Sequence, residues 1–482
     1  MGRKKEPLVL REPGRAGLYV CGVTVYDYCH IGHARVMVVF DIIVRYLRAC
    51  GLEVTYVRNF TDIDDKIIQR ASALNIPFQQ LTEQFIAAFH ADMEALGVGK
   101  ADVEPRATEH LAEMQAMIAS LLAKGLAYPG GGDIFYAVDR FPAYGQLSGK
   151  NLAELQSGSR VDVDTHKRNP LDFVLWKKAK PGEPHWPSPW GEGRPGWHIE
   201  CSAMSGKYLG TAFDIHGGGM DLLFPHHENE IAQSEGSTGQ PWVRYWLHNG
   251  FVNVLTDSGE REKMSKSLGN FSTIRDLLAH YPGEVVRLFI LNSHYRSPLD
   301  FSTELLETAR HGMDRLYSAL AGANKALQAT APDRTATGET VPDREEWGSW
   351  ATDAAHFFAA MDDDFNTPQA IAVLFDIAKK INRAIPLLEQ GQAETGAEIQ
   401  TGVDLLRHLA AILGLLGDDP DHYFHRQGEE GLADVEIDRL IQQRLDARQA
   451  RDFPAADRIR QQLQEAGITL QDTKEGTTWR RA

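Results

Sequence analysis

The chain has 482 residues, of which 43% are hydrophobic and 24% are charged, and its formal net charge is −16. This length predicts several domains rather than one core, and no apolar run approaches the ~20 residues that a membrane span requires. The strongly negative charge argues against a nonspecific nucleic-acid binder, which is usually basic, although it leaves room for a local basic surface.

The first predicted elements form a strand–helix–strand unit. Residues 17–22 (GLYVCG) are typical of a short buried strand that ends in a glycine turn. Residues 33–49 have the amphipathic pattern of a helix, which Cys50-Gly51 ends, and residues 52–60 are β-branched and aromatic, as in a second strand. Such a unit indicates a parallel sheet.

The middle of the chain predicts an insertion into that parallel-sheet domain. Helical patterns over residues 77–95 and 107–124 precede a region rich in Gly, Pro and Trp, 128–190, which contains a strand-like piece at 133–138. The helix, strand and glycine pattern returns over residues 196–251. We therefore expect one sheet domain interrupted by a segment of mixed structure.

The chain after Asp300 is almost wholly helical in pattern. A polar stretch at 330–343 and a second gap at 417–431 divide it. The final compact segment reverses the sign of the charge, because residues 437–482 carry nine Arg and Lys against seven Asp and Glu. This local excess of positive charge suits contact with a polyanion.

Two short clusters are candidates for phosphate chemistry. Residues 30–33 (HIGH) precede the first predicted helix, where backbone N–H groups and the helix dipole favour an anion and Gly32 permits close approach. Residues 263–267 (KMSKS) follow a glycine-bearing stretch, and their ammonium groups suit the stabilisation of charge developing on a phosphate. Each cluster alone would more often be an ordinary surface turn or basic loop.

A third cluster has the residue types of a metal site. His226 and Glu230 are four residues apart and would share one face of a helix, which suits two ligands of one metal. Cys21 and Cys201 supply thiolates, and two cysteines, one histidine and one carboxylate make a plausible tetrahedral zinc set. A lone cysteine is more often packed than ligating.

The other two cysteines, Cys29 and Cys50, receive that plain packing interpretation. Four cysteines in a chain this long do not form a disulfide scaffold. The charged N-terminal residues lack the apolar segment of a secretory signal. We therefore expect a cytoplasmic protein with reduced thiols.

Taken together, the HIGH and KMSKS segments resemble the two signatures of class I aminoacyl-tRNA synthetases, in the expected order. Residues 19–27 (YVCGVTVYD), 59–66 (NFTDIDDK) and 196–204 (GWHIECSAM) resemble the cysteinyl-tRNA synthetase family, and the resemblance runs from Tyr19 to Arg481. It implies an enzyme that uses ATP with Mg²⁺, and one Zn²⁺ per subunit, to join L-cysteine to tRNA(Cys). It also implies a monomer that does not bind membranes.

The resemblance implies an α/β fold: a Rossmann-like, doubly wound parallel-sheet catalytic domain with an insertion, then a helical bundle and a small C-terminal anticodon-binding domain. The expected bounds are 1–115 and 191–250 for the two catalytic halves, 116–190 for the inserted connective domain, 251–303 for the connecting fold with the KMSKS loop, 304–425 for the bundle, and 426–482 for the anticodon-binding domain.

The resemblance also assigns site residues. The zinc ligands are Cys21, Cys201, His226 and Glu230. The catalytic residues are His30, His33, Lys263 and Lys266, and ATP binding adds Gly32, Asp221 and Ser265. The residues of the cysteine pocket are Gly22, Thr61, Trp197 and His227.

A zinc ion in the amino-acid site accounts for the expected specificity. A thiol that binds zinc loses its proton and coordinates strongly, whereas a hydroxyl binds far more weakly. An apolar pocket rejects poorly an isostere that differs by one polar group. A separate editing domain is therefore unnecessary, and no segment of the chain is long enough to form one.

Contacts to tRNA are predicted at the end of the chain. Arg444, Arg448 and Arg451 fall at helical spacing and would form a positive stripe, although the interleaved Asp446 and Asp452 equally suit a solvated face. The closing residues Trp479 and Arg480 resemble the last motif of the family, where an aromatic ring and a guanidinium suit base stacking and phosphate contact.

Three other functions remain open at this stage. A cysteine ligase of the mycothiol pathway resembles the catalytic half but joins cysteine to an amino sugar and lacks the anticodon-binding domain, so residues 436–481 argue against it. A non-catalytic RNA-binding paralogue is disfavoured by the intact lysine and histidine segments. Another class I synthetase, such as the methionine enzyme, is disfavoured by the four-ligand metal pattern.

Overall fold

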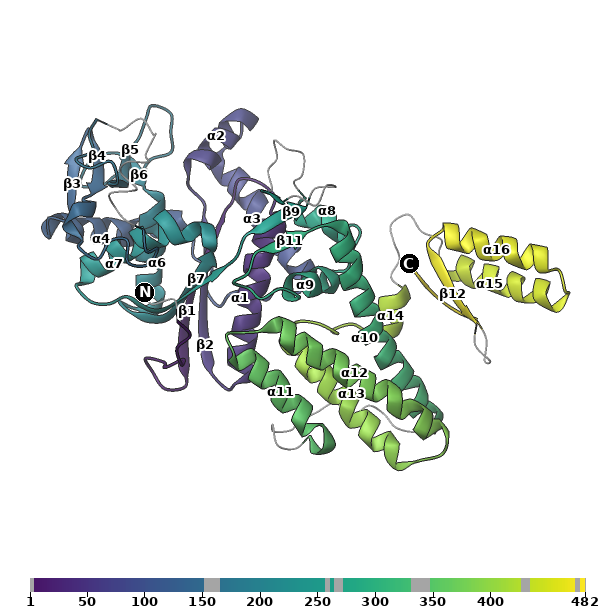
Figure 1. The fold of residues 1–482 in the computed structure, drawn as a ribbon. Helices are drawn as coiled ribbons and strands as arrows, with labels where there is room; N and C mark the ends of the chain where they lie inside the picture. The colour runs from purple at the N-terminus through teal and green to yellow at the C-terminus, as the bar shows by residue number, and fades with distance from the viewer. Residues whose placement is uncertain are drawn as a thin grey trace. The chain divides into compact units, whose positions relative to one another are not determined.

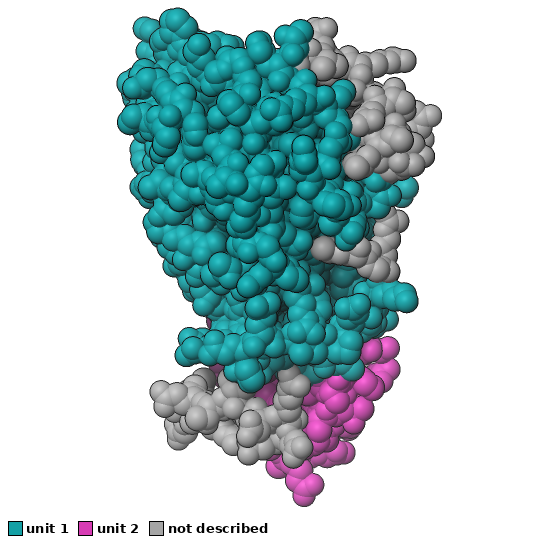
Figure 2. Space-filling model, turned by 90° about the vertical axis from the view of Figure 1, so that its left-hand side faces the viewer, with its two compact units in different colours: residues 1–309, 357–371, 412–414 teal, residues 310–356, 372–411, 415–482 magenta. Residues whose placement is uncertain are grey.

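The computed structural model describes residues 4–150, 165–255, 261–263, 272–330, 347–425, 434–472 and 477–481. The chain divides into two compact units (Figure 2). The first unit comprises Met1–Ala309, Phe357–Ile371 and Ile412–Gly414, and the second comprises Arg310–His356, Ala372–Ala411 and Leu415–Ala482. No helix in the described part of the chain is both long enough and apolar enough to span a bilayer.

A four-stranded parallel sheet forms the centre of the first unit, with strand order β2-β1-β7-β8. Its strands are β1 (Arg15–Thr24), β2 (Glu53–Thr61), β7 (Phe213–Gly219) and β8 (Val243–Asn249). Because the strands are parallel, their carboxyl ends meet at one edge, which is where open α/β sheets bind ligands. The expected doubly wound parallel sheet is confirmed.

Helices lie on both sides of this sheet (Figure 1). Helix α1 (Ile31–Ala49) packs on one side, and α6 (Trp197–Leu209) and α7 (Glu228–Thr238) lie on the other. The ring of Phe40 on α1 lies so close to Gly217 on β7 that a Cβ at that glycine would overlap it. Helix α1 ends at Cys50, and the left-handed φ of Gly51, +82°, turns the chain into β2.

A second sheet lies between β2 and β7 in the sequence, in the region where the insertion 116–190 is predicted. This antiparallel sheet has the order β3-β4-β5-β6. The strands are β3 (Ala127–Gly130), β4 (Asp133–Tyr136), β5 (Phe173–Lys178) and β6 (Gly193–Pro195), and the preceding helices are α2 (Asp65–Leu74), α3 (Phe78–Ala95) and α4 (Leu111–Ala123), with short helical turns η1 (Ala107–Glu109) and η2 (Val138–Arg140). Helix α2 was not predicted from the sequence.

A three-stranded sheet follows β8, with order β10-β9-β11. Its elements are β9 (Val252–Leu255), β10 (Arg261–Lys263) and β11 (Leu299–Phe301), with the helices α8 (Ile274–Leu278) and α9 (Gly283–Leu291) between β10 and β11. The amide of Ile274 donates to the carbonyl of Cys29 at 2.9 Å, so the start of α8 is bonded to the chain just before the HIGH segment.

The rest of the described chain is mainly helical, as expected. The elements are α10 (Thr303–Thr330), η6 (Gly348–Trp350), α11 (Ala351–Asp362), α12 (Thr367–Glu389), α13 (Glu394–Ile412), α14 (Pro420–His425), α15 (Asp434–Gln449) and α16 (Phe453–Glu465), then the antiparallel strands β12 (Ile468–Asp472) and β13 (Thr477–Arg481). Buried Ile437, Leu463 and Ile468 give the last of these elements a small core of their own.

Candidate active site and metal centre

Four side chains from three distant segments converge on one buried point near the carboxyl edge of the parallel sheet. Cys21 lies on β1, Cys201 on α6, His226 in the short helical turn η4 (Leu223–His227), and Glu230 on α7. Their ligand atoms all lie within 4.8 Å of one another, and each side chain is buried. The expected helix-like spacing brings His226 and Glu230 together, since Nε2 and Oε1 are 2.8 Å apart.

The distances between these donor atoms suit a metal of zinc size. Cys21 Sγ lies 3.6 Å from Cys201 Sγ and 3.4 Å from both His226 Nε2 and Glu230 Oε1. Two sulfurs on a tetrahedral zinc are roughly 3.7 Å apart, and a sulfur and a nitrogen or oxygen roughly 3.5 Å. The residues present therefore fit a zinc ion in chemistry and in the distances from Cys21. His226 Nε2 and Glu230 Oε1, at 2.8 Å, are hydrogen-bonded and would have to separate to roughly 3.3 Å to share a tetrahedral zinc.

The four cluster side chains differ in the direction of their pKa shifts. Burial would raise the pKa of Glu230, but His216 and His226 hold it well below its usual range. Burial would likewise raise the pKa of Cys201, yet hydrogen bonds with Cys21 and His226 lower it to about 6. Burial would lower the pKa of His226, and the Glu230 carboxylate raises it to about 10. Glu230 and Cys201 are thus held as anions, whereas burial raises the pKa of Cys21 well above its usual range and His226 keeps a proton. A metal at this site would have to displace these two protons, because it binds thiolate and neutral imidazole.

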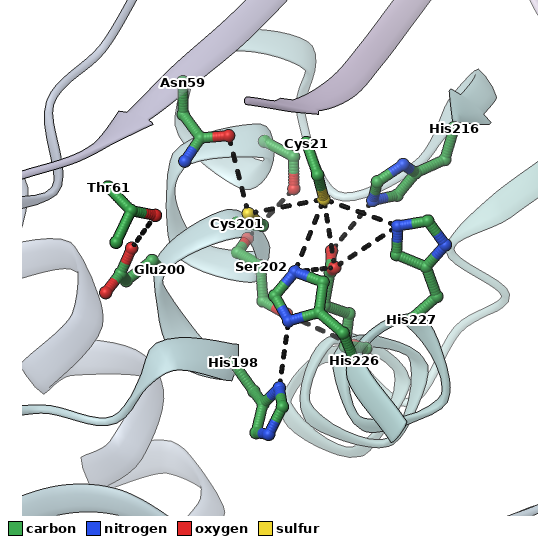
Figure 3. Close-up of polar contacts among 12 residues, drawn as sticks. Cys21, Asn59, Thr61, His198, Glu200, Cys201, Ser202, His216, His226 and His227 are labelled. Atoms are coloured by element: carbon green, nitrogen blue, oxygen red, sulfur yellow. Dashed lines mark hydrogen bonds and ion pairs between the residues drawn. The ribbon is translucent and has the colours of Figure 1, made fainter. Parts of the chain in front are cut away.

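More histidines surround this cluster than the sequence interpretation used (Figure 3). His198 Nδ1 lies 2.9 Å from His226 Nδ1, and His216 Nε2 lies 2.8 Å from Glu230 Oε2. His227 Nε2 lies 3.4 Å from Cys21 Sγ, and its Nδ1 lies 2.7 Å from His248 Nε2. Such partners fix the ring orientation of metal ligands. The sequence analysis did not single out His198 or His248.

A second possible ligand set shares two members with the first. Cys21, His216, His227 and Glu230 also bring ligand atoms within 4.8 Å of one another. This set lacks the second thiolate, Cys201, and sulfur ligands favour zinc. The set with both cysteines therefore suits zinc better.

Three of the expected cysteine-pocket residues border the metal cluster. The Trp197 ring stacks on His226 with centroids 4.3 Å apart, and it remains 40% exposed. The amide of Gly22 donates to Asn59 Oδ1 at 2.9 Å, and a Cβ at Gly22 would overlap the Asn59 carbonyl oxygen. His227 contacts Cys21 as described above.

The fourth expected pocket residue, Thr61, ends strand β2 and is buried. Its hydroxyl donates to the carboxyl of Glu200 at 2.8 Å. Burial raises the pKa of Glu200 well above its usual range. Glu200 lies within the GWHIECSAM segment, but sequence alone gave no reason to select it from its neighbours.

The HIGH segment begins α1 in an unexpected way. His30 Nδ1 accepts the amide of Gly32 at 3.0 Å, and His33 Nδ1 accepts the amide of His30 at 3.2 Å. The two N–H groups are thus bonded to imidazoles, whose proton must then lie on Nε2. Burial and the neighbouring His30 and Lys66 lower the pKa of His33 to about 3, so this ring is a neutral donor through Nε2. Phosphate binding here would use ring N–H groups.

The structure describes only some of the remaining residues expected at the ATP site. Asp221 is exposed in the turn η3 (Met220–Leu222), directly after β7 at the carboxyl edge of the sheet. The Lys263 backbone pairs with Asn253 in the β9–β10 hairpin. Ser265 and Lys266 lie outside the described residues.

The expected tRNA contacts do not form one continuous exposed stripe. Arg444 is buried and its guanidinium lies 3.4 Å from Thr477 Oγ1. Arg448 is exposed on α15, and Arg451 is exposed beyond the end of that helix with a φ of +61°. Trp479 on β13 donates through Nε1 to Asp438 at 2.8 Å. The Arg480 side chain lies outside the described part of the structure.

The fold and the convergent site define a class I tRNA synthetase. The family described as "tRNA synthetases class I (C) catalytic domain" matches residues 8–311. A methionyl-tRNA synthetase of Mycobacterium tuberculosis, solved with methionyl-adenylate, has a similar fold with a TM-score of 0.61 at 17% identity over 84% of this chain and 92% of that one. A LeuRS ternary complex from Agrobacterium radiobacter K84 gives a TM-score of 0.59 at 12% identity, with 85% of each chain covered.

Sequence relatives narrow this class. A "Cysteine--tRNA ligase" of Magnetococcus marinus is 60% identical over 100% of this chain and 97% of its own length. Proteins of the same name from Thioalkalivibrio sulfidiphilus and Geobacter sulfurreducens are 57% and 52% identical over 99% of this chain, with 98% and 97% of their lengths covered. The "DALR domain" and "Cysteinyl-tRNA ligase anticodon binding domain" families match residues 356–417 and 432–480. The chain belongs to the cysteine–tRNA ligase family.

Proposed function

We propose that this chain joins L-cysteine to tRNA(Cys) and that it selects the amino acid at a zinc ion held by Cys21, Cys201, His226 and Glu230. The observation that carries the proposal is the convergence of two sulfurs, one imidazole and one carboxylate within 4.8 Å. Zinc bound there would act as a Lewis acid, which coordinates a thiolate strongly and a hydroxyl weakly.

The residues around the cluster would shape the rest of the cysteine pocket. Trp197 offers its exposed ring as a wall, while its stacking on His226 orients that imidazole. Gly22 keeps the β1 backbone close to Asn59, so no side chain narrows the space beside Cys21. Thr61 contributes a hydroxyl at the carboxyl end of β2. His227 and its partner His248 close the opposite side of the cluster.

Activation would take place along the same edge of the sheet. The cysteine carboxylate attacks the α-phosphate of ATP, which yields cysteinyl-adenylate and pyrophosphate. His30 and His33 donate to the phosphates through Nε2, Gly32 allows their close approach, and Asp221 faces the ribose. Lys263, Ser265 and Lys266 stabilise the charge that develops on the phosphates, together with Mg²⁺ bound to ATP. The acyl group then passes to the terminal ribose of the tRNA.

The C-terminal domain, 426–482, would bind the anticodon. Arg448 and Arg451 offer exposed guanidiniums for phosphates, and Trp479 and Arg480 lie on the closing strand. Arg444 would act from within, since it is buried beside Thr477. We further propose the domain bounds given above, a monomer, and a cytoplasmic location; the last is supported by four free cysteines.

Cysteine-dependent exchange between ATP and pyrophosphate tests this proposal. We expect exchange with cysteine, less than about a hundredth of it with serine, and loss of the cysteine signal when the metal is fully removed by a chelator. Restored exchange after zinc is added back would complete the test. Equal exchange with serine, or full activity of metal-free protein, would contradict selection by zinc.

A further inference from the structure

Glu200 is a buried acidic residue to which neither the metal cluster nor the expected pocket assigns a role. It is 1% exposed on α6, between Trp197 and the metal-cluster residue Cys201. Its Oε2 accepts the hydroxyl of Thr61 at 2.8 Å, and within the described chain its Oε1 has no hydrogen-bond partner. A buried polar atom without a partner costs stability, so this residue calls for a functional explanation.

Strand β2 places Thr61 on the same side as the metal cluster. Asn59 and Thr61 are two residues apart, so their side chains share one face of the strand. Asn59 Oδ1 lies 3.6 Å from Cys201 Sγ. Thr61 therefore lies one two-residue strand repeat further along β2 than Asn59, a distance of roughly 6.6 Å. Figure 3 shows the side-chain oxygen of Asn59 directed at Cys201, and Glu200 beside Thr61.

Only Cβ and Cα separate the sulfur of cysteine from its nitrogen, so a cysteine with its sulfur in the cluster keeps its amino group within about 4 Å of that sulfur. We place this amino group on the side of the cluster where Thr61 lies. A threonine hydroxyl has one proton and two lone pairs. Since the Thr61 proton is donated to Glu200, the lone pairs of Oγ1 remain as acceptors. The α-ammonium group of an amino acid carries only donors, so this orientation of the hydroxyl suits it. This direction of the bond holds when the Glu200 carboxyl is ionised and when its proton lies on Oε1, whereas a proton on Oε2 would reverse it.

We propose that Glu200 is a positioning residue that fixes the hydroxyl of Thr61 as a hydrogen-bond acceptor for the α-ammonium group of L-cysteine. This inference rests on the proposed cysteine site. It assigns the two ends of the substrate to different parts of the protein, with sulfur at the metal cluster and nitrogen at the carboxyl end of β2.

A purely structural role for Glu200 is the competing explanation. Glu200 lies in the first turn of α6, where a carboxyl group interacts favourably with the helix dipole. In that case its removal would lower the stability of α6 and disturb Cys201 on the same turn. Loss of a structural role would weaken binding of every ligand of the site, whereas loss of the positioning role would weaken only ligands that carry an amino group.

The test compares cysteine with 3-mercaptopropionate, which keeps the thiol and carboxylate but lacks the amino group. We would measure the KM for cysteine in ATP–pyrophosphate exchange and the inhibition constant of 3-mercaptopropionate. For Glu200→Met and Thr61→Val we expect a rise of about tenfold or more in the cysteine KM, as for loss of a hydrogen bond to a charged group. The inhibition constant, the KM for ATP and the zinc content should stay unchanged.

Matched variants separate the hydrogen bond from bulk packing. Glu200→Gln keeps an oxygen acceptor and Thr61→Ser keeps the hydroxyl, so each should hold the cysteine KM within about threefold of the parent. The double variant Thr61→Val with Glu200→Met should be no weaker than either single variant, because both remove the same interaction.

Several results would overturn the inference. They are parallel weakening of 3-mercaptopropionate, loss of zinc from Glu200→Met, additive effects in the double variant, or a Glu200→Gln protein as impaired as Glu200→Met. Should Glu200→Met fail to fold, Thr61→Val and Glu200→Gln still decide. Failure of the proposed function itself would be distinguished by a parent protein without cysteine-dependent exchange.

Discussion

The metal cluster illustrates what single residues reveal in a sequence. His226 and Glu230 were predictable as a pair because a spacing of four places them on one helix face, and cysteines are rare enough in this chain to stand out. The partners of these residues were not predictable. The contact of His198 with His226 and that of Thr61 with Glu200 join segments distant in sequence, and only tertiary packing brings them together.

Replacing a proposed zinc ligand should remove both metal and activity. In Cys201→Ser the hydroxyl is a poor zinc ligand, so we expect loss of bound zinc and a fall in cysteine-dependent exchange on the order of 100-fold or more. Metal analysis and exchange assays would measure this. Cys50→Ser is the control, since Cys50 lies at the end of α1; it should keep zinc. A Cys201→Ser protein with full zinc content would remove Cys201 from the ligand set.

Gly22 should be intolerant of any side chain. A Cβ there would overlap the Asn59 carbonyl oxygen, a backbone atom that cannot move without disturbing the β1–β2 pairing. We expect Gly22→Ala to lower the free energy of unfolding by about 3 kcal/mol, measured by urea denaturation. Gly206 on α6 has open space around its Cβ position, and Gly206→Ala should instead raise stability by about 0.5–1 kcal/mol. Equal stability of both variants would show that β1 can shift.

At the scale of elements, the hydrophobic pattern predicted where strands and helices lie. It did not predict the side-chain hydrogen bonds that join one element to another. The expected strand at 17–22 and helix at 33–49 correspond to β1 and α1 with slightly wider bounds. The imidazole capping of α1 was missed because the sequence does not show which nitrogen accepts. Also missed was the buried Arg35, which donates to the carbonyls of Gly250, Phe251, Tyr295 and Ser297 and so fastens α1 to the chain around β9 and β11.

We expect that lysine cannot replace Arg35 without a loss of stability. Arg35 serves carbonyls from two segments through its planar fork of donors, whereas an ammonium group cannot reach the same set. We expect Arg35→Lys to lower the free energy of unfolding by about 2–4 kcal/mol, because buried carbonyls lose their donors. Urea denaturation would measure it. Arg48→Lys, at an exposed ion pair with Asp102, should change stability by less than about 1 kcal/mol. A small effect at Arg35 would mean that these carbonyls find other partners.

At the scale of the whole molecule, the sign of the charge differs between the part of the chain that holds the metal cluster and the final segment. The net charge is −16, yet the last segment is locally positive. The metal cluster and the HIGH segment lie in the first compact unit, while the candidate anticodon contacts lie in the second. The succession of sheet domain, insertion, helices and small final domain was predictable from pattern and resemblance. The burial of Arg444 was not, because helical spacing alone does not say which face of α15 packs inward.

Removing the two exposed arginines should affect tRNA and spare activation. For Arg448→Ala with Arg451→Ala we expect weaker binding of tRNA(Cys) and a slope of log K against log salt smaller by about two, one for each phosphate that an arginine no longer neutralises. Cysteine-dependent exchange should be unchanged. Binding titrations over a range of salt concentrations would measure the slope. An unchanged slope would remove these two residues from the tRNA-binding surface.

The central claim is that a metal held by this chain meets the substrate sulfur directly. X-ray absorption at the zinc edge, on the purified protein with and without cysteine, tests it most directly. Two sulfur neighbours, from Cys21 and Cys201, are expected in the free protein, with one more after cysteine is added and no more after serine is added. A sulfur count that does not change with cysteine would contradict the account.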